Sequence, residues 1–593
     1  MRKTIKRLGA VLLAMAMAVS VLCTGALAAE STYTLTIQDS NKDHKYTAYQ
    51  VFAGTVQNTT EDKKQLNVTG WGDGVNLTST PTEGTYSGKT LVQAIQEITV
   101  NSTKPFEGKT EPGDIAAALG AEADNAVATA FADVVANYVT GSGHSTTGWT
   151  PANNDTSAHY EITGLTGGYY FVKSANTAST DVANTRYMLE VVGDATVAAK
   201  NGVPTVDKKV QNTNNTNQDF ADTTTAQVGQ TVNFKLTGTL PSNYDHYKSY
   251  EYIFHDTLSK GLTLTTEQEK ALFVKVYDSQ NAADSDKDGS SSTVGTKLDI
   301  GNYTVAVTPN NDANTTSLKV AFNDLKTIQK DNTALITKDS VIVVYYSATI
   351  NGSATAGGAG NQNSVKLEYS NDPNKTSTGT TTPDEVSVFT FKLDITKTKK
   401  GDTKTNLAGA KFVLSTSADL KIDVADSDEN LDSNVKNSLI KVTGTTPNYV
   451  INDGTSISAN EQYIMETGKD TNLGQLNITG LNKGVYYLYE TKAPDGYNRI
   501  TEPIKIEITE ATTEKNTDGE FSVTSLKFKI NNGDEQNGTT TDGVIKANVE
   551  NTSGSTLPST GGMGTKLFYT IGGILMAGAA IVLVVRKRRS DAE

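Results

Sequence analysis

Two lysines stand at positions where a strand pattern places core residues. In Phe389-Thr-Phe391-Lys-Leu393-Asp-Ile395-Thr-Lys397 the apolar residues occupy every second position, so Lys397 shares their face of the strand. In Val206-Asp-Lys208-Lys-Val210, Lys208 lies between two valines in the same way. A buried, unpaired ammonium group is costly and tends to lose its proton. The pattern therefore predicts two lysines whose neutral amines can act as nucleophiles.

A carboxyl group and an amide occur in matching positions further along the chain. Glu490 follows the aromatic run 486–489, which reads as a buried strand, and Asn551 continues the apolar face of the strand Ile545 to Asn551. Burial lowers the pKa of a lysine and raises that of a carboxyl group, so both groups can be neutral. The amine can then attack the Asn carboxamide, while the acid polarises the amide and shuttles protons as ammonia leaves. The product is an amide crosslink formed once, with proximity supplying the rate.

The residues alone leave a second interpretation open. A lysine on such a strand can extend its amine to solvent, and an asparagine can cap a strand end. Positioning the three groups for reaction requires strands that bring the first and last parts of a domain together.

Most of the chain has the alternation that antiparallel β-sandwiches require, as in 33–37 and 341–346. Helical spacing occurs at 115–119 and again from Val127 to Tyr138, both in the first segment. Polar joints near Pro204 and Pro383 separate three segments. We predict a mostly β protein of tandem Ig-like sandwiches, spanning 29–203, 204–388 and 389–553, the first with one or two added helices.

An internal repeat links the first and third segments. The run from Ile162 to Ser174 matches that from Ile478 to Glu490 in spacing, through a turn that enters an aromatic strand. The first copy ends in Ser174 where the second has Glu490. We therefore predict the same sandwich design in both segments and no crosslink of this type in the first.

Both ends of the chain carry sorting information. Residues 1–28 have the basic start, apolar run and small-residue end of a secretory signal peptide, and they contain the only cysteine, Cys23. Residues 554–593 contain the pentapeptide Leu557-Pro558-Ser559-Thr560-Gly561, an apolar run from 567 to 585 and four basic residues at 586–589. The run is just long enough to span a bilayer as a helix, with the basic residues on the cytoplasmic side. A plain membrane anchor is the alternative.

Composition excludes several classes of function. Without both sorting segments, the chain has 43 basic and 64 acidic residues, a net charge of −21, which argues against nucleic-acid binding. It would also lack cysteine, and hence disulfides and thiolate metal sites. The five histidines show no metal-ligand spacing, and the calcium-like run Asp284-Ser-Asp286-Lys-Asp288-Gly289 has Gly295 where a bidentate Glu is needed. We expect no cofactor and no metal.

Several motifs resemble those of sortase-assembled backbone pilins, the shaft subunits of Gram-positive pili, over nearly the whole chain. The runs 251–262 and 360–369 resemble the CnaA-like isopeptide domain, and 407–412 and 489–497 resemble the CnaB-like domain and its E-box. The order of pentapeptide, span and basic tail resembles the cell-wall sorting signal of these proteins.

The resemblance implies two autocatalytic isopeptide bonds. The first would join Lys208 to Asn363 with Asp256 as the acid, and the second would join Lys397 to Asn551 with Glu490. Asn361 and Asn548 are the alternative acceptors. Alternation does not separate Asn361 from Asn363, whereas Asn548 falls on the polar face of its strand.

The resemblance also implies covalent polymerisation on the cell surface. A sortase would cut between Thr560 and Gly561 and pass the threonyl group to a lysine of the next copy or to a peptidoglycan precursor. The family pattern around that lysine is Val-Tyr-Pro-Lys-Asn, and the run Val197-Ala-Ala-Lys200-Asn201 makes Lys200 the candidate, without the Tyr and Pro. Minor pilins and host ligands are further expected partners. The alternative function is a monomeric, wall-anchored adhesin or minor pilin, and neither function is that of an enzyme with turnover.

Overall fold

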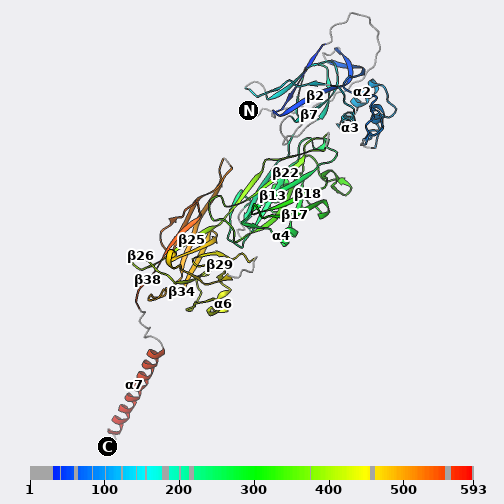
Figure 1. Ribbon diagram of the computed structural model, residues 1–593. Helices are drawn as coiled ribbons and strands as arrows, with labels where there is room; N and C mark the ends of the chain where they lie inside the picture. The colour runs from blue at the N-terminus through cyan, green and yellow to red at the C-terminus, as the bar shows by residue number, and fades with distance from the viewer. Residues whose placement is uncertain are drawn as a thin grey trace, which may run out of the picture.

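Three β-rich modules follow one another along the chain, and an apolar helix lies beyond the last of them (Figure 1). The computed structural model describes residues 31–590 except for 40–41, 59–63, 83–84, 101, 122–124, 142, 154–156, 177–185, 200–201, 213–218, 374–375, 455–460, 518 and 555–562. The predicted signal peptide at 1–28, Lys200 and the pentapeptide at 557–561 therefore lie outside the described residues.

The N-terminal module has three layers, because its second sheet is covered on both faces. One face packs on the first sheet through a core that includes Tyr46 and Ile162, and the other packs on helices through Phe52 and Phe131. The first sheet contains β1 (Tyr33–Gln38), β5 (Trp149–Thr150), β6 (His159–Leu165) and β9 (Ala195–Ala198). The second contains β2 (His44–Asn58), β3 (Lys64–Trp71), β4 (His144–Ser145), β7 (Gly168–Asn176) and β8 (Arg186–Val191). The helices are α1 (Leu91–Gln96), α2 (Pro112–Ala121) and α3 (Asn125–Val135).

The middle module is a sandwich of two larger sheets. The first contains β10 (Val206–Asn212), β12 (Thr231–Gly238), β14 (Leu262–Thr263), β15 (Phe273–Tyr277), β16 (Thr296–Lys297) and β21 (Val341–Ile350). The second contains β11 (Thr223–Thr225), β13 (Tyr252–Ser259), β17 (Tyr303–Asn310), β18 (Thr315–Phe322), β22 (Asn361–Ser370), β23 (Thr378–Thr380) and β24 (Asp384–Phe389). A small pair, β19 (Gln329–Lys330) and β20 (Thr333–Ala334), and the helices α4 (Thr266–Ala271) and α5 (Gln280–Ser285) complete it.

The C-terminal module begins and ends on neighbouring parallel strands, β25 (Phe391–Lys399) and β38 (Val544–Asn551). Their sheet also contains β26 (Asp402–Asn406), β29 (Val442–Thr445), β30 (Asn448–Ile451), β31 (Glu461–Gln462) and β33 (Gln475–Leu481). The facing sheet contains β27 (Lys411–Ser415), β28 (Leu439–Ile440), β32 (Met465–Glu466), β34 (Gly484–Lys492), β35 (Ile504–Lys515), β36 (Phe521–Ile530) and β37 (Gln536–Asn537). The short helix α6 (Ser433–Lys436) lies outside the sheets.

The predicted fold class is confirmed, with three corrections. The first module carries three helices, α1, α2 and α3, where one or two were predicted. Helices also occur outside the first module, as α4, α5 and α6, which are too short to give a helical period. Phe389, which alternation placed on the first strand of the third segment, instead ends β24, and β25 begins at Phe391. The chain passes between sheets at Thr390, whose hydroxyl donates to the carbonyl of Leu481.

Strand registers confirm the predicted repeat between the first and third segments. Leu35 on β1 pairs with Ile162, and Leu393 on β25 pairs with Ile478. Each of these first strands also pairs in parallel with the last strand of its module, β9 or β38. The two modules therefore share one arrangement of entry strand, repeat strand and exit strand.

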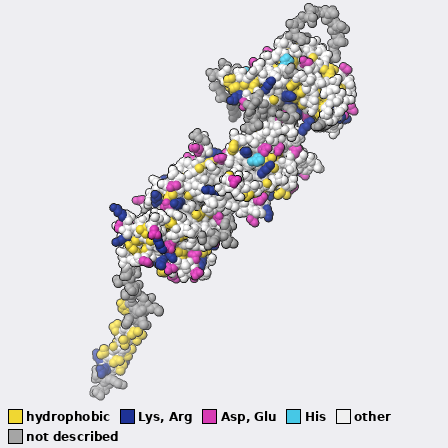
Figure 2. All heavy atoms as spheres, in the orientation of Figure 1, with side chains coloured by type: hydrophobic (Ala, Val, Ile, Leu, Met, Phe, Trp, Pro, Cys, Tyr) yellow, Lys and Arg dark blue, Asp and Glu magenta, His cyan; other side chains and the backbone are white. Residues whose placement is uncertain are grey.

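The C-terminal helix α7 (Met563–Ser590) matches the predicted span. Its stretch Tyr569–Arg588 has a mean hydropathy of 1.8 and exposes its apolar side chains, as Figure 2 shows along the helix. A helix of 20 residues with this composition is long enough to cross a bilayer.

Candidate crosslinking sites

The three predicted groups of the C-terminal module meet in its core. Lys397 Nζ lies 3.4 Å from Glu490 Oε1, and Asn551 Nδ2 donates to Glu490 Oε2 at 2.9 Å. All three residues are buried. The carboxyl group thus contacts both the amine and the amide that the predicted reaction would join.

Strand register places Lys397 and Asn551 together. On the parallel pair β25 and β38, Lys397 lies opposite Val549, and Asn551 is the next residue along β38 with its side chain on the same face. Glu490 reaches them from β34 in the facing sheet. Its Oε2 accepts from the backbone amide of Ile500 at 2.7 Å, and the carbonyl of Asn498 accepts from Asn551 Nδ2 at 2.6 Å. Backbone contacts therefore hold both the acid and the amide in position.

Burial lowers the pKa of Lys397 to about 8, against the opposing effect of the Glu490 carboxylate. The ammonium also lies over the Phe412 ring, 5.8 Å from its centroid, so an apolar wall borders the amine. A substantial fraction of the amine is neutral near physiological pH, as nucleophilic attack requires.

Asn548, the alternative acceptor, is exposed on the outer face of β38. Its Oδ1 accepts from the hydroxyl of Thr398 at 2.9 Å, away from the buried amine. The geometry favours Asn551, as alternation predicted.

The middle module holds a second set of buried groups between its two sheets. Lys208 Nζ on β10 donates to Asp256 Oδ1 on β13 at 2.5 Å, and both side chains are inaccessible to solvent. Asn363 on β22 is also fully buried. It pairs with Leu258, two residues beyond Asp256, so its side chain and that of Asp256 share the inner face. Burial lowers the pKa of Lys208 to about 8, while Asp256 opposes the shift.

Asn361 shares this face but is engaged elsewhere. Its Nδ2 donates to the carbonyls of Thr355 and Val388, and its Oδ1 accepts from the Thr355 amide at 2.8 Å. These bonds fix the turn before β22. Asn363 Oδ1, by contrast, is buried with no hydrogen-bond partner in the described part of the chain. The contacts favour Asn363 as the acceptor.

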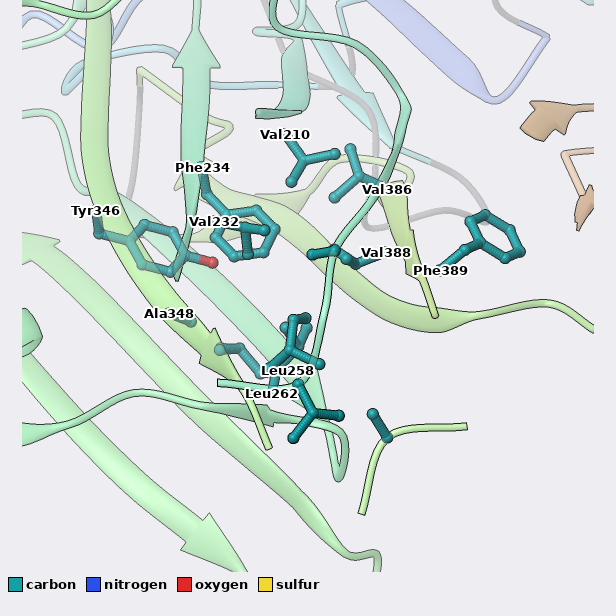
Figure 3. Close-up of a cluster of buried hydrophobic side chains, with 14 of the residues drawn as sticks. Val210, Val232, Phe234, Leu258, Leu262, Tyr346, Ala348, Val386, Val388 and Phe389 are labelled. Carbon is teal, nitrogen blue, oxygen red and sulfur yellow. The ribbon is translucent and has the colours of Figure 1, made fainter. Parts of the chain in front are cut away.

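The middle site also contains a tyrosine, Tyr346, that the sequence did not predict. The Tyr346 hydroxyl, on β21, donates to Asp256 Oδ2 at 2.5 Å and accepts from Asn363 Nδ2 at 2.6 Å. Its ring stacks on Phe234 with centroids 5.0 Å apart, within the buried cluster of Figure 3. An aromatic residue in an apolar strand looks like an ordinary core residue. The alternation along 341–346 indicates a strand, but it gives no sign that the hydroxyl has a role.

One topological expectation for this site is wrong. The sequence predicts that the reacting strands bring the first and last parts of a domain together. Asn363 lies on β22, and β23 and β24 follow it before the module ends. Only the C-terminal site joins first and last strands, because β38 ends that module whereas β24 inserts beside β22 in the middle one.

In the N-terminal module, other residues stand at the two described positions that are equivalent to Lys397 and Glu490. Ser174 is buried on β7, and it pairs with Tyr46 in the same way that Glu490 pairs with Phe412. Leu35 and Leu393 are equivalent in the two registers, so Asp39, four residues after Leu35, stands at the position of Lys397. Its Oδ2 accepts from the Tyr46 hydroxyl at 2.7 Å and lies 2.6 Å from His44 Nδ1. The described residues thus place no lysine at this position.

The calcium-like run at 284–289 contributes its middle carboxylate to the core of the middle module. Asp286 is buried, forms an ion pair with Lys275 and accepts from the Tyr277 hydroxyl at 2.9 Å. Asp284 and Asp288 are exposed. The central carboxylate of the run is thus a core ion-pair partner.

Comparisons with known proteins match two parts of the chain to described families and most of it to a surface protein. Residues 392–522 match the prealbumin-like fold domain SpaA, and residues 549–592 match the LPXTG cell wall anchor motif. The chain is 26% identical over 428 residues to the trypsin-resistant surface T6 protein of Streptococcus pyogenes serotype M6, covering 67% of this chain and 71% of that protein. The chain therefore contains a prealbumin-like SpaA domain and an LPXTG cell wall anchor motif.

Solved structures similar to this chain include the T6 backbone pilin of Streptococcus pyogenes, at 16% identity and a TM-score of 0.47, covering 89% of this chain and 100% of that one. The full-length major pilin SpaD from Corynebacterium diphtheriae is similar at 14% identity and a TM-score of 0.43, covering 89% of this chain and 99% of that one.

Proposed function

We propose that the protein is the backbone subunit of a covalently polymerised, cell-wall-anchored pilus. The observation that carries the proposal is the combination of an LPXTG anchor motif at 549–592 with two sandwiches, the middle and C-terminal modules, that each bury a lysine, an acid and an asparagine. The relationship to the T6 surface protein supports the same conclusion. The protein acts as a substrate of sortase and carries out no reaction with turnover.

Polymerisation joins the C-terminal threonine of one mature chain to an internal lysine of the next. Sortase cleaves between Thr560 and Gly561, holds the threonyl group, and transfers it to an amine. In the growing shaft the amine is that of Lys200 of another copy, and at the base it belongs to the peptidoglycan precursor. Lys200 follows β9, which ends at Ala198, and precedes β10, which begins at Val206, so it lies at the joint between the first two modules.

Within each copy, two intramolecular bonds replace disulfides. In the C-terminal module, the Lys397 amine attacks the carboxamide carbon of Asn551. Glu490 gives a proton to the departing nitrogen and takes one from the attacking nitrogen, so an amide and one ammonia form and the acid is regenerated. In the middle module Lys208, Asp256 and Asn363 react in the same way. Folding supplies the rate by holding the groups together.

Loss of polymer in a lysine variant tests the proposal. Wall extracts of cells that express the protein with its sortase should give a regular ladder on denaturing gels, and Lys200→Ala should reduce the ladder to the monomer. Lys209→Ala, which removes a half-exposed lysine of β10, is the matched control and should keep the ladder. A wild-type protein that stays monomeric favours the adhesin function instead. A normal ladder in Lys200→Ala means that another lysine accepts the threonyl group.

A further inference from the structure

The two candidate sites differ in how the acid reaches the amide. In the C-terminal site, Asn551 Nδ2 donates directly to Glu490 at 2.9 Å. In the middle site, the hydrogen bonds of the described residues connect Asp256 to Asn363 only through the Tyr346 hydroxyl, at 2.5 and 2.6 Å. The tyrosine therefore occupies the position through which a proton must pass.

The surroundings suit this role. The same hydroxyl lies 3.4 Å from Lys208 Nζ, so it touches the nucleophile, the acid and the leaving nitrogen. It supplies the only hydrogen bond that the described residues make to the Asn363 side chain. Burial and the neighbouring Asp256 raise the pKa of Tyr346 well above its usual value, so the phenol stays protonated at neutral pH. A group of this kind passes a proton on only as it receives another.

We propose that Tyr346 is a catalytic residue of the middle-module crosslink, relaying a proton from Asp256 to the departing nitrogen of Asn363. The inference rests on the proposed isopeptide chemistry. The Lys208 ammonium group first gives a proton to the Asp256 carboxylate, and the neutral amine that remains attacks the Asn363 carboxamide carbon. As the carbon–nitrogen bond breaks, Tyr346 gives its proton to Nδ2 and receives the proton of Asp256. Asp256 then takes a proton from the attacking nitrogen, so one amide and one ammonia form and both acid groups are restored.

Tyr346→Phe tests the relay, with bond formation followed over time. The ectodomain is synthesised in a short pulse, quenched in acid at intervals and digested, and the crosslinked peptides of both sites are measured. We expect the Lys208–Asn363 bond to form about 10²-fold more slowly, the size of a general acid–base contribution. The Lys397–Asn551 bond in the same molecules should form at its normal rate, which reports that the chain folds.

Tyr345→Phe is the matched control. Tyr345 is the adjacent residue of β21 on the opposite face, and its buried hydroxyl donates to the carbonyl of Asp286 at 3.1 Å. The change also removes one buried hydroxyl from the same strand, but the Lys208–Asn363 bond should form at the wild-type rate.

The outcomes separate the relay from the chemistry on which it rests. A wild-type protein without the Lys208–Asn363 bond refutes the crosslink itself. A wild-type rate in Tyr346→Phe overturns the relay. If Tyr346→Phe fails to fold, 3-fluorotyrosine at position 346 keeps the shape and makes the phenol more acidic. Faster bond formation is then expected, and an unchanged rate overturns the relay.

Discussion

Removing the acceptor of the C-terminal crosslink should destabilise that module strongly. Asn551→Ala deletes the carboxamide but leaves the Lys397–Glu490 ion pair in place. The lost bond would close a loop of about 154 residues, and the chain-entropy relation for crosslinks gives about 5 kcal/mol for a loop of this length. A change of that size corresponds to a fall of about 10–20 °C in the melting temperature of a module of this size.

Calorimetry and mass spectrometry on the secreted ectodomain measure this prediction together. The melting transition of the C-terminal module should shift by that amount, and the mass should rise by one ammonia after allowance for the substitution. Asn548→Ala is the matched control, because Asn548 lies on the exposed face of the same strand. It should keep the wild-type mass deficit and change stability by about 0.5 kcal/mol or less.

Two results would refute this reasoning. An Asn551→Ala protein that keeps both ammonia losses would mean that Lys397 reacts with another group. A protein that has lost the bond but melts within about 2 °C of wild type would mean that the crosslink does not limit the unfolded chain in the way assumed.

Two further predictions concern rate and force. In each site the lysine and the acid share one proton, which the acid must hold when the neutral amine attacks. Because burial lowers the pKa of each lysine to about 8, we expect the rate of bond formation in newly synthesised, unlinked protein to be nearly constant from pH 6 to 7 and to fall above pH 8, where the pair loses this proton. A rate that keeps rising above pH 8 would contradict the assignment. When one copy is pulled between its joints with a force probe, the C-terminal module should not extend, since its bond joins first and last strands. The middle module should release only the segment after Asn363 through β24, at most about 90 Å of chain, and a longer release from that module would contradict the Lys208–Asn363 bond.

The residues of the C-terminal site were the easiest to predict from the sequence, because strand alternation alone places Lys397 and Asn551 on buried faces. Lys397 and Asn551 each break an apolar face, and a charged or amide group in such a position stands out. Alternation could not separate Asn361 from Asn363, since both face inward. The distinction depends on the bonds that Asn361 makes to the turn at Thr355, which exist only in the folded chain.

Other features could not be predicted from the sequence, for different physical reasons. Tyr346 looks like an ordinary core aromatic, and only the approach of β21 to β13 and β22 gives its hydroxyl a role. The replacement of lysine by Asp39 became visible once the registers of β1 and β25 could be compared. Short helices such as α4 bury too few residues to produce a period, and the place of β24 beside β22 depends on sheet pairing across the module.

The mass of the wild-type ectodomain, measured intact and after digestion, shows whether the two isopeptide bonds exist. We expect a mass lower than the sequence mass by two molecules of ammonia, with one crosslinked peptide pair joining Lys208 to Asn363 and another joining Lys397 to Asn551. A protein with its full sequence mass, in which all four residues appear in unlinked peptides, would contradict this expectation.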